Sequence, residues 1–146
     1  MNHALDPRTR PAKRPLGNSR ILVGAETPQE AFDIERILQD DGYTDIHITT
    51  DLREIVPLLN VKAFDLLIID MHSLLIDSAL LLHKLPHEVI NVKMQTLALV
   101  NPGHEPTRLN ALVAGACDTL TRPARRKEVI EKVGAILRPP LGSVRL

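Results

Sequence analysis

The 146-residue sequence contains few of the residues on which several classes of small protein depend. Its one cysteine, Cys117, excludes an internal disulfide and lacks the companions of a cysteine zinc site. Three aromatic residues, Phe32, Tyr43 and Phe64, leave little for stacking on bases or flavin rings. No apolar run approaches the roughly 18 residues of a membrane span, and no signal-peptide core follows the first charges. We therefore expect a cytoplasmic protein with an aliphatic core and no membrane association.

Net charge is also absent, because 18 lysine and arginine residues balance 18 aspartate and glutamate residues. No overall field therefore favours nucleic acid or an acidic membrane surface. Residues 1–19 combine prolines with basic residues and have no apolar period, which predicts a disordered basic leader. The remaining length fits one domain over residues 20–138, followed by a C-terminal tail over 139–146.

From residue 20 onward, short apolar runs alternate with segments of helical periodicity. Strands are predicted at 21–23, 46–48, 66–69, 96–100 and 119–121. Helices are predicted from 28 to the glycine at 42, over 51–59, 75–85 and 106–114, and along 129–137 up to Pro139. Five strands alternating with five helices predict an α/β fold, a doubly wound five-stranded parallel sheet with helices on both faces.

Local signals predict where several helices begin and end. Thr27 and Glu30 form a capping box in which Glu30 reaches back to the start of the first helix. Gly42 ends this helix as a left-handed cap. Pro57 should kink or shorten the second helix, and Pro86 should stop the third.

The run 65–70 places four apolar residues before Asp70, as expected for a central strand that delivers a carboxylate to its C-terminal end. In an open parallel sheet this edge is where ligands bind. Glu26 and the residues after Val100 and Thr121 should converge on the same edge. Asp70 either takes part in chemistry there or caps a neighbouring loop.

Three segments together resemble the receiver domain of two-component response regulators, over about residues 20–137. Residues 21–26 resemble its first strand and acidic pair, and residues 65–70 resemble the strand that ends in the phosphoacceptor aspartate. Residues 114–123 resemble the signature Gly-Ala-x-Asp-Tyr-Leu-x-Lys-Pro. The resemblance implies a (βα)5 flavodoxin-like fold in which Asp70 accepts phosphate from a histidine kinase or phosphotransfer protein.

The resemblance also implies a magnesium site, with weakened affinity. Its ligands would be the carboxylates of Glu26 and Asp70 and the backbone carbonyl of His72. Ala25 stands where the family has its first acid and offers no side-chain ligand, so the site carries less negative charge.

Two further positions depart from the family pattern. Val100 replaces the threonine or serine whose hydroxyl contacts the phosphate, and Arg122 replaces the lysine. A concrete alternative to phosphorylation follows, in which Arg122 bridges Asp70 and Glu26 in place of metal and phosphate.

Two main hypotheses for function remain open, neither of them enzymatic. In one, a pseudo-receiver with weak or absent phosphorylation acts in phosphorelay signalling by binding a downstream protein, since no effector domain follows. In the other, Asp70 with magnesium is a working phosphoacceptor that serves as a switch or phosphate sink. A flavodoxin-like cofactor-binding module, the third reading, would need a phosphate loop and stacking aromatics. The resemblance makes Leu109, Leu112 and Thr119 candidates for a partner or homodimer face.

Overall fold

The computed structural model describes residues 18–88 and 93–138. Nearly all of the predicted leader, the whole predicted tail and the predicted helix end at Pro139 lie outside the described residues, so the domain boundaries stay predictions. The strands are β1 (Arg20–Gly24), β2 (Asp45–Thr49), β3 (Leu66–Asp70), β4 (Gln95–Val100) and β5 (Asp118–Thr121). The helices are α1 (Pro28–Asp40), α2 (Ile55–Val61), α3 (Ser78–Glu88), α4 (Glu105–Ala114) and α5 (Arg126–Leu137), with a 3-10 turn η3 (Leu52–Glu54) before α2.

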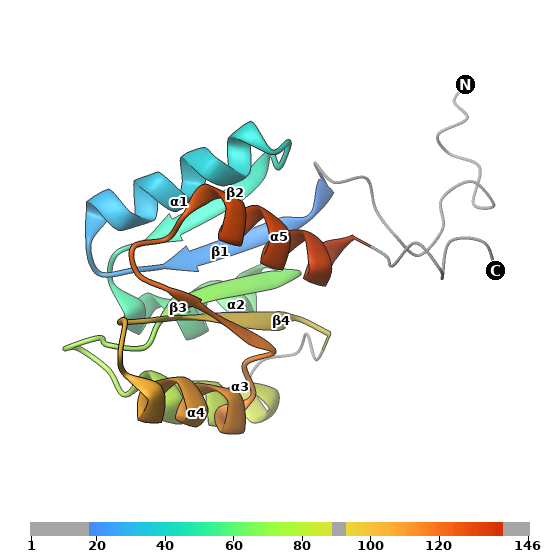
Figure 1. The fold of residues 1–146 in the computed structure, drawn as a ribbon. Coiled ribbons are helices and arrows are strands. Elements are labelled where there is room, and N and C mark those ends of the chain that lie inside the picture. The colour runs from blue at the N-terminus through green and yellow to red at the C-terminus, as the bar shows by residue number, and fades with distance from the viewer. Residues whose placement is uncertain (1–17, 89–92, 139–146) are drawn as a thin grey trace, which may run out of the picture.

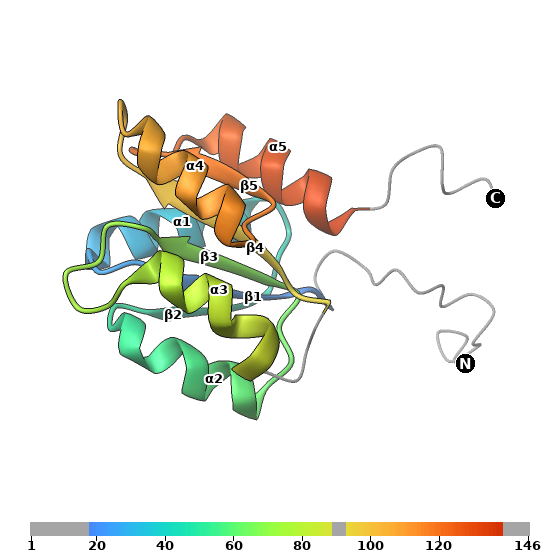
Figure 2. The ribbon, with the colours of Figure 1, turned by 90° about the horizontal axis from the view of Figure 1, so that it is seen from below.

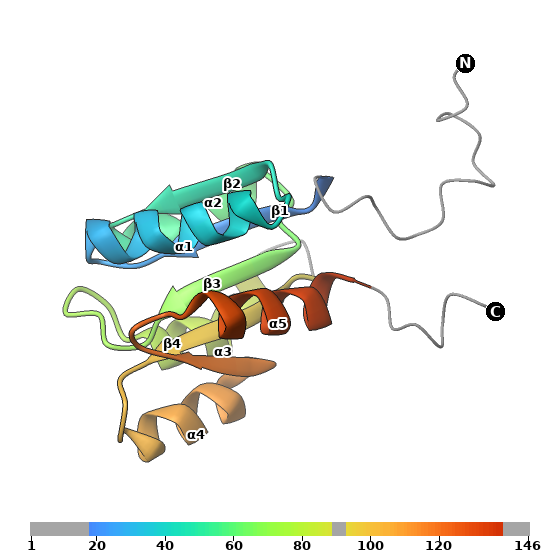
Figure 3. The same ribbon diagram turned by 45° about the horizontal axis from the view of Figure 1, so that its top comes forward.

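The five strands form one sheet in the order β2-β1-β3-β4-β5, and every neighbouring pair is parallel. Helices α1 and α5 cover one face, in front of the sheet in Figure 3, while α2, α3 and α4 cover the other (Figures 1 and 2). The predicted doubly wound α/β fold is confirmed. Because all neighbouring strands are parallel, the C-terminal ends of β1, β3 and β4 meet at one edge of the sheet.

Alternating side chains of the central strands build two apolar layers. Toward α1 and α5, Val23 and Ile68 pack with Ile34 of α1 and Val133 of α5. Toward α2, α3 and α4, Leu22, Leu67, Ile69 and Ala98 pack with Leu52, Ile55, Leu82, Leu85 and Ala111. All five residues of β3 are buried, Asp70 included. The sheet therefore carries this carboxylate into a largely dry position at its edge.

The two prolines that were expected to disturb helices both lie inside them. Pro57 lies in the first turn of the seven-residue helix α2, after the 3-10 turn, and the helix continues past it to Val61, so the expected shortening at Pro57 is not observed. Pro86 lies inside α3, and the prediction that it stops this helix is wrong. A proline near a helix end costs the hydrogen bond of its own position but does not prevent a few further helical residues.

The start of α3 also differs from the prediction, because the helix begins at Ser78 rather than near Leu75. The hydroxyl of Ser73 accepts hydrogen bonds from the backbone N–H groups of Leu75, at 3.0 Å, and Ile76, at 3.2 Å. Side-chain bonds of this kind compete with helical ones and keep the segment as a loop. Across the described part of the chain, no helix has the length and apolarity needed to cross a bilayer.

Candidate functional site

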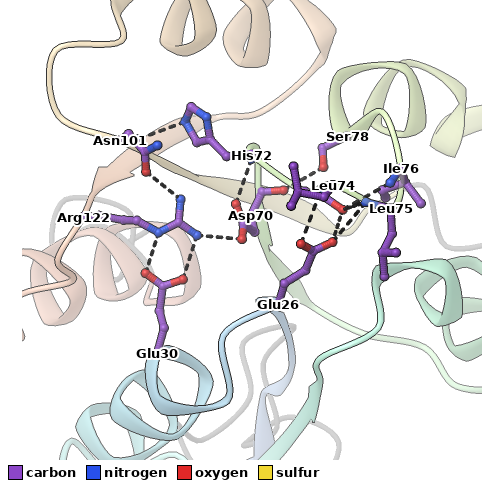
Figure 4. Close-up of polar contacts among 11 residues, drawn as sticks. Glu26, Glu30, Asp70, His72, Leu74, Leu75, Ile76, Ser78, Asn101 and Arg122 are labelled. Atoms are coloured by element: carbon purple, nitrogen blue, oxygen red, sulfur yellow. Dashed lines mark hydrogen bonds and ion pairs between the residues drawn. The ribbon is translucent and has the colours of Figure 1, made fainter.

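Polar side chains from four chain segments meet at the C-terminal edge of the sheet (Figure 4). Asp70 ends β3, and Asn101 and Arg122 directly follow β4 and β5. Glu26 lies between β1 and α1, and Glu30 lies in the first turn of α1. Their convergence follows from parallel topology, because every strand delivers its last residue to the same edge.

Both carboxylate oxygens of Asp70 have partners, and its side chain is only 6% exposed. Oδ2 lies 2.7 Å from Nη2 of Arg122, and Oδ1 accepts a hydrogen bond of 2.8 Å from the backbone N–H of His72. The backbone carbonyl of Asp70 accepts a bond of 2.7 Å from the hydroxyl of Ser78. The carboxylate is thus held by a cation on one side and by its own loop on the other.

Arg122 is the centre of the cluster. Its Nε and Nη2 donate to the two carboxylate oxygens of Glu30, each at 2.7 Å, in the bidentate geometry of strong arginine–carboxylate pairs. Its Nη1 donates to Oδ1 of Asn101 at 3.0 Å. Burial by itself lowers the pKa of Arg122, but the hydrogen bonds to Glu30 and Asp70 outweigh it and raise this pKa above its ordinary value. The guanidinium therefore stays charged throughout the range in which the protein is folded.

The expected bridge between Asp70 and Glu26 must be corrected. The Arg122–Asp70 contact is present, but the second carboxylate on Arg122 is Glu30, and the expectation for Glu26 is wrong. The capping-box prediction fails for the same reason, because Thr27 makes no side-chain capping bond and the carboxylate of Glu30 is directed to Arg122. The charge of the guanidinium outcompetes a neutral backbone N–H as partner for Glu30.

Glu26 serves a different structure, the loop between β3 and α3. Its carboxylate accepts hydrogen bonds from the hydroxyl of Ser73 and from the backbone N–H groups of Leu74, at 3.1 Å, and Leu75, at 3.3 Å. The side chain of Leu74 is almost fully exposed on this loop. The carboxylate of Glu26 thus fixes the conformation of the loop between β3 and α3.

His72 links the β3 end to the β4 end through its side chain. Its Nε2 accepts a hydrogen bond of 2.9 Å from the backbone N–H of Asn101, which requires an unprotonated Nε2 and hence a neutral ring. Burial, with a contribution from the charge of Arg122, lowers the pKa of His72 and favours this neutral form. The ring of His104 packs edge-on against it, with ring centres 5.1 Å apart.

This set of donors does not fit a magnesium ion, which prefers octahedral oxygen coordination. One oxygen of Asp70 is paired with a guanidinium, and the carboxylate of Glu26 is satisfied by the loop after β3. Ala25 has no oxygen to offer in its side chain. Within residues 18–88 and 93–138, no three histidine, cysteine, aspartate or glutamate side chains are grouped to hold a metal ion. The positive charge beside Asp70 is supplied by Arg122.

Two other predicted positions carry no polar group into the cluster. Val100 is buried at the end of β4, where it presents no hydroxyl. Its backbone carbonyl accepts a bond of 2.9 Å from the backbone N–H of Arg122, which fixes the start of the segment after β5. Thr119 is buried within β5. The sequence placed Asn101, the residue after Val100, at this edge and assigned Glu30 to a helix cap, but it identified neither as a hydrogen-bond partner of Arg122.

Comparison with known proteins identifies the fold. No family model matches the sequence. A two-component response regulator from Clostridium difficile superposes with a TM-score of 0.74 at 21% identity, over 83% of this chain and 97% of that chain. The receiver domain of Francisella response regulator 1452 gives 0.73 at 24% identity, over 83% and 98%. An orphan response regulator of H. pylori gives 0.71 at 21% identity, over 85% and 100%. The chain therefore has the fold of the response-regulator receiver domain.

Proposed function

We propose that the protein is an atypical receiver-type signalling module, a pseudo-receiver that acts by binding other proteins without depending on phosphorylation. The observation that carries the proposal is the 2.7 Å ion pair between Arg122 Nη2 and Asp70 Oδ2 in a mostly buried site. Both oxygens of the Asp70 carboxylate are engaged, one by Arg122 and one by the backbone N–H of His72, so neither is free to act as a nucleophile.

The surroundings of Asp70 support this reading. Attack by a carboxylate on a phosphoryl group needs a free oxygen and cations that neutralise the charge of the transferred group. The cation that is present, Arg122, is already paired with two carboxylates. Glu30 adds negative charge beside this guanidinium, which disfavours an incoming phosphoryl group, and Val100 offers no hydroxyl to bind one.

A working phosphoacceptor is the second candidate, favoured by the position of Asp70 at the C-terminal end of β3. In that case a histidine kinase or phosphotransfer protein would supply phosphate, and magnesium bound by Glu26 and Asp70 would have to displace Arg122. No observation favours a flavodoxin-like cofactor module. In either case we expect the output to be contact with a downstream protein or with a second copy of the chain.

Incubation with acetyl phosphate and magnesium, followed by intact-protein mass measurement, separates the two candidates. An ordinary receiver domain serves as positive control, and Asp70→Ala serves as negative control. We expect no added phosphoryl group under conditions that modify the positive control. A base-labile gain of one phosphoryl group that disappears in Asp70→Ala would overturn the pseudo-receiver proposal and establish the phosphoacceptor.

A further inference from the structure

Glu30 is the least expected member of the cluster, because it connects α1 to Arg122, which lies 92 positions later in the chain. Its side chain is mostly buried, and both of its carboxylate oxygens lie on Arg122. Neither a metal site nor a helix cap accounts for this placement, because Thr27 provides no capping bond and Glu30 faces the guanidinium (Figure 4).

We infer that Glu30 is a positioning residue that holds the guanidinium of Arg122 over Asp70 and thereby controls access to the Asp70 carboxylate. The inference rests on the proposed function and extends it, because it names the residue that keeps the site closed. In this role Glu30 takes the place that an incoming anion would occupy on Arg122.

The distribution of hydrogen bonds supports this role. Arg122 directs one N–H group to Asp70, at 2.7 Å, but two to Glu30. A single contact leaves the plane of a guanidinium free to turn, whereas a bidentate pair fixes it. An arginine side chain has many rotamers, and holding it in one of them costs conformational entropy. The bidentate pair with Glu30 therefore orients the guanidinium, and the single bonds to Asn101 and Asp70 add to it.

The two carboxylates also keep Arg122 in the site through their negative charge. If Arg122 swung out to solvent, the carboxylates of Asp70 and Glu30 would both remain in a mostly buried site without a counter-ion. An anionic reagent that approached Asp70 would have to compete with Glu30 for the guanidinium and would face its negative charge. Glu30 therefore acts on Asp70 through Arg122, and its removal should open the site.

The test compares Glu30→Gln with Glu35→Gln, a matched loss of charge on the same helix. Two readouts report on the site without any need for phosphorylation. The first is the rate at which a water-soluble carbodiimide and glycinamide convert Asp70 to an amide, followed by peptide mass mapping. The second is the solvent-exchange rate of the Arg122 Nε–H proton by NMR. We expect Glu30→Gln to raise both rates by about tenfold or more, the effect of losing a charge-assisted bond, and Glu35→Gln to leave them unchanged.

Equal rates in the two variants would overturn the inference. The wild-type protein provides a second measurement that does not depend on folding of a variant. In it, the Arg122 Nε–H proton should exchange far more slowly than that of exposed Arg36, and equal rates would also overturn the inference. Because acetyl phosphate is not used, failure here would leave the pseudo-receiver proposal standing. Conversely, phosphorylation of Asp70 in the wild type would defeat that proposal without settling which residue positions Arg122.

Discussion

Arg122→Ala should destabilise the domain strongly, because the substitution leaves two carboxylates without a counter-ion. The side chains of Asp70 and Glu30 are only 6% and 14% exposed, so water cannot fully replace the guanidinium. Removing one partner of a buried ion pair costs about 3–5 kcal/mol, and the partial exposure of Glu30 places this case near 3 kcal/mol. The lost bond to Asn101 adds about 1 kcal/mol or less. For a domain of this size, a total loss of about 3–4 kcal/mol lowers Tm by about 12–16 °C.

Urea unfolding and thermal unfolding, both followed by circular dichroism, measure this loss. Arg126→Ala is the matched control, because Arg126 pairs with Asp40 on the surface and should contribute less than about 1 kcal/mol. A loss as small as that of the control would refute the idea of a mostly buried, charge-neutralising arginine.

Three further perturbations test other parts of the structure. The folded protein lowers the pKa of His72 below its ordinary 6.5, so the unfolded chain binds the proton more readily. The free energy of unfolding should therefore fall as the pH drops below about 6.5. The urea midpoint of His72→Gln should fall less than that of the wild type over the same pH range. Glu26→Gln should speed hydrogen exchange at the Leu74 amide and lower the free energy of unfolding by about 1 kcal/mol. An unchanged exchange rate would contradict the idea that Glu26 fixes the loop between β3 and α3. In Gly24→Ala the new Cβ would lie 2.9 Å from Cδ1 of buried Ile55, so we expect the free energy of unfolding in urea to fall by about 1–2 kcal/mol. An unchanged urea midpoint would contradict this expectation.

Apolar periodicity was sufficient to locate the sheet. Each predicted strand differs from the observed one by at most one residue at either end. The central strands β1, β3 and β4 are covered on both faces and are marked by uninterrupted apolar runs. Gly42 adopts the positive φ angle expected at the end of α1, 103°, and Gly115 after α4 also has a positive φ angle, 125°. The third helix was predicted less well, since its start depends on hydrogen bonds that the Ser73 hydroxyl accepts from the backbone, which the local pattern does not reveal.

The site was predictable only in part. Parallel topology was enough to bring Asp70 and Arg122 to one edge, and opposite charges then made their contact an expectation. The position of Glu30 three residues after Thr27 pointed to a local cap, and only the folded chain reveals its distant partner. One signal was available in the sequence: a guanidinium has five N–H donors, more than Asp70 alone can accept, so further acceptors near Arg122 were to be expected.

The central claim is that a guanidinium, and not a divalent cation, neutralises Asp70. Titration of the 15N-labelled protein with Mn²⁺ tests it directly, because this paramagnetic ion occupies magnesium sites and broadens nearby NMR signals. We predict no saturable broadening of the amide signals of His72 and Asn101, which flank the carboxylate. Saturable broadening at both amides that is competed by Mg²⁺ and lost in Asp70→Asn would contradict the claim.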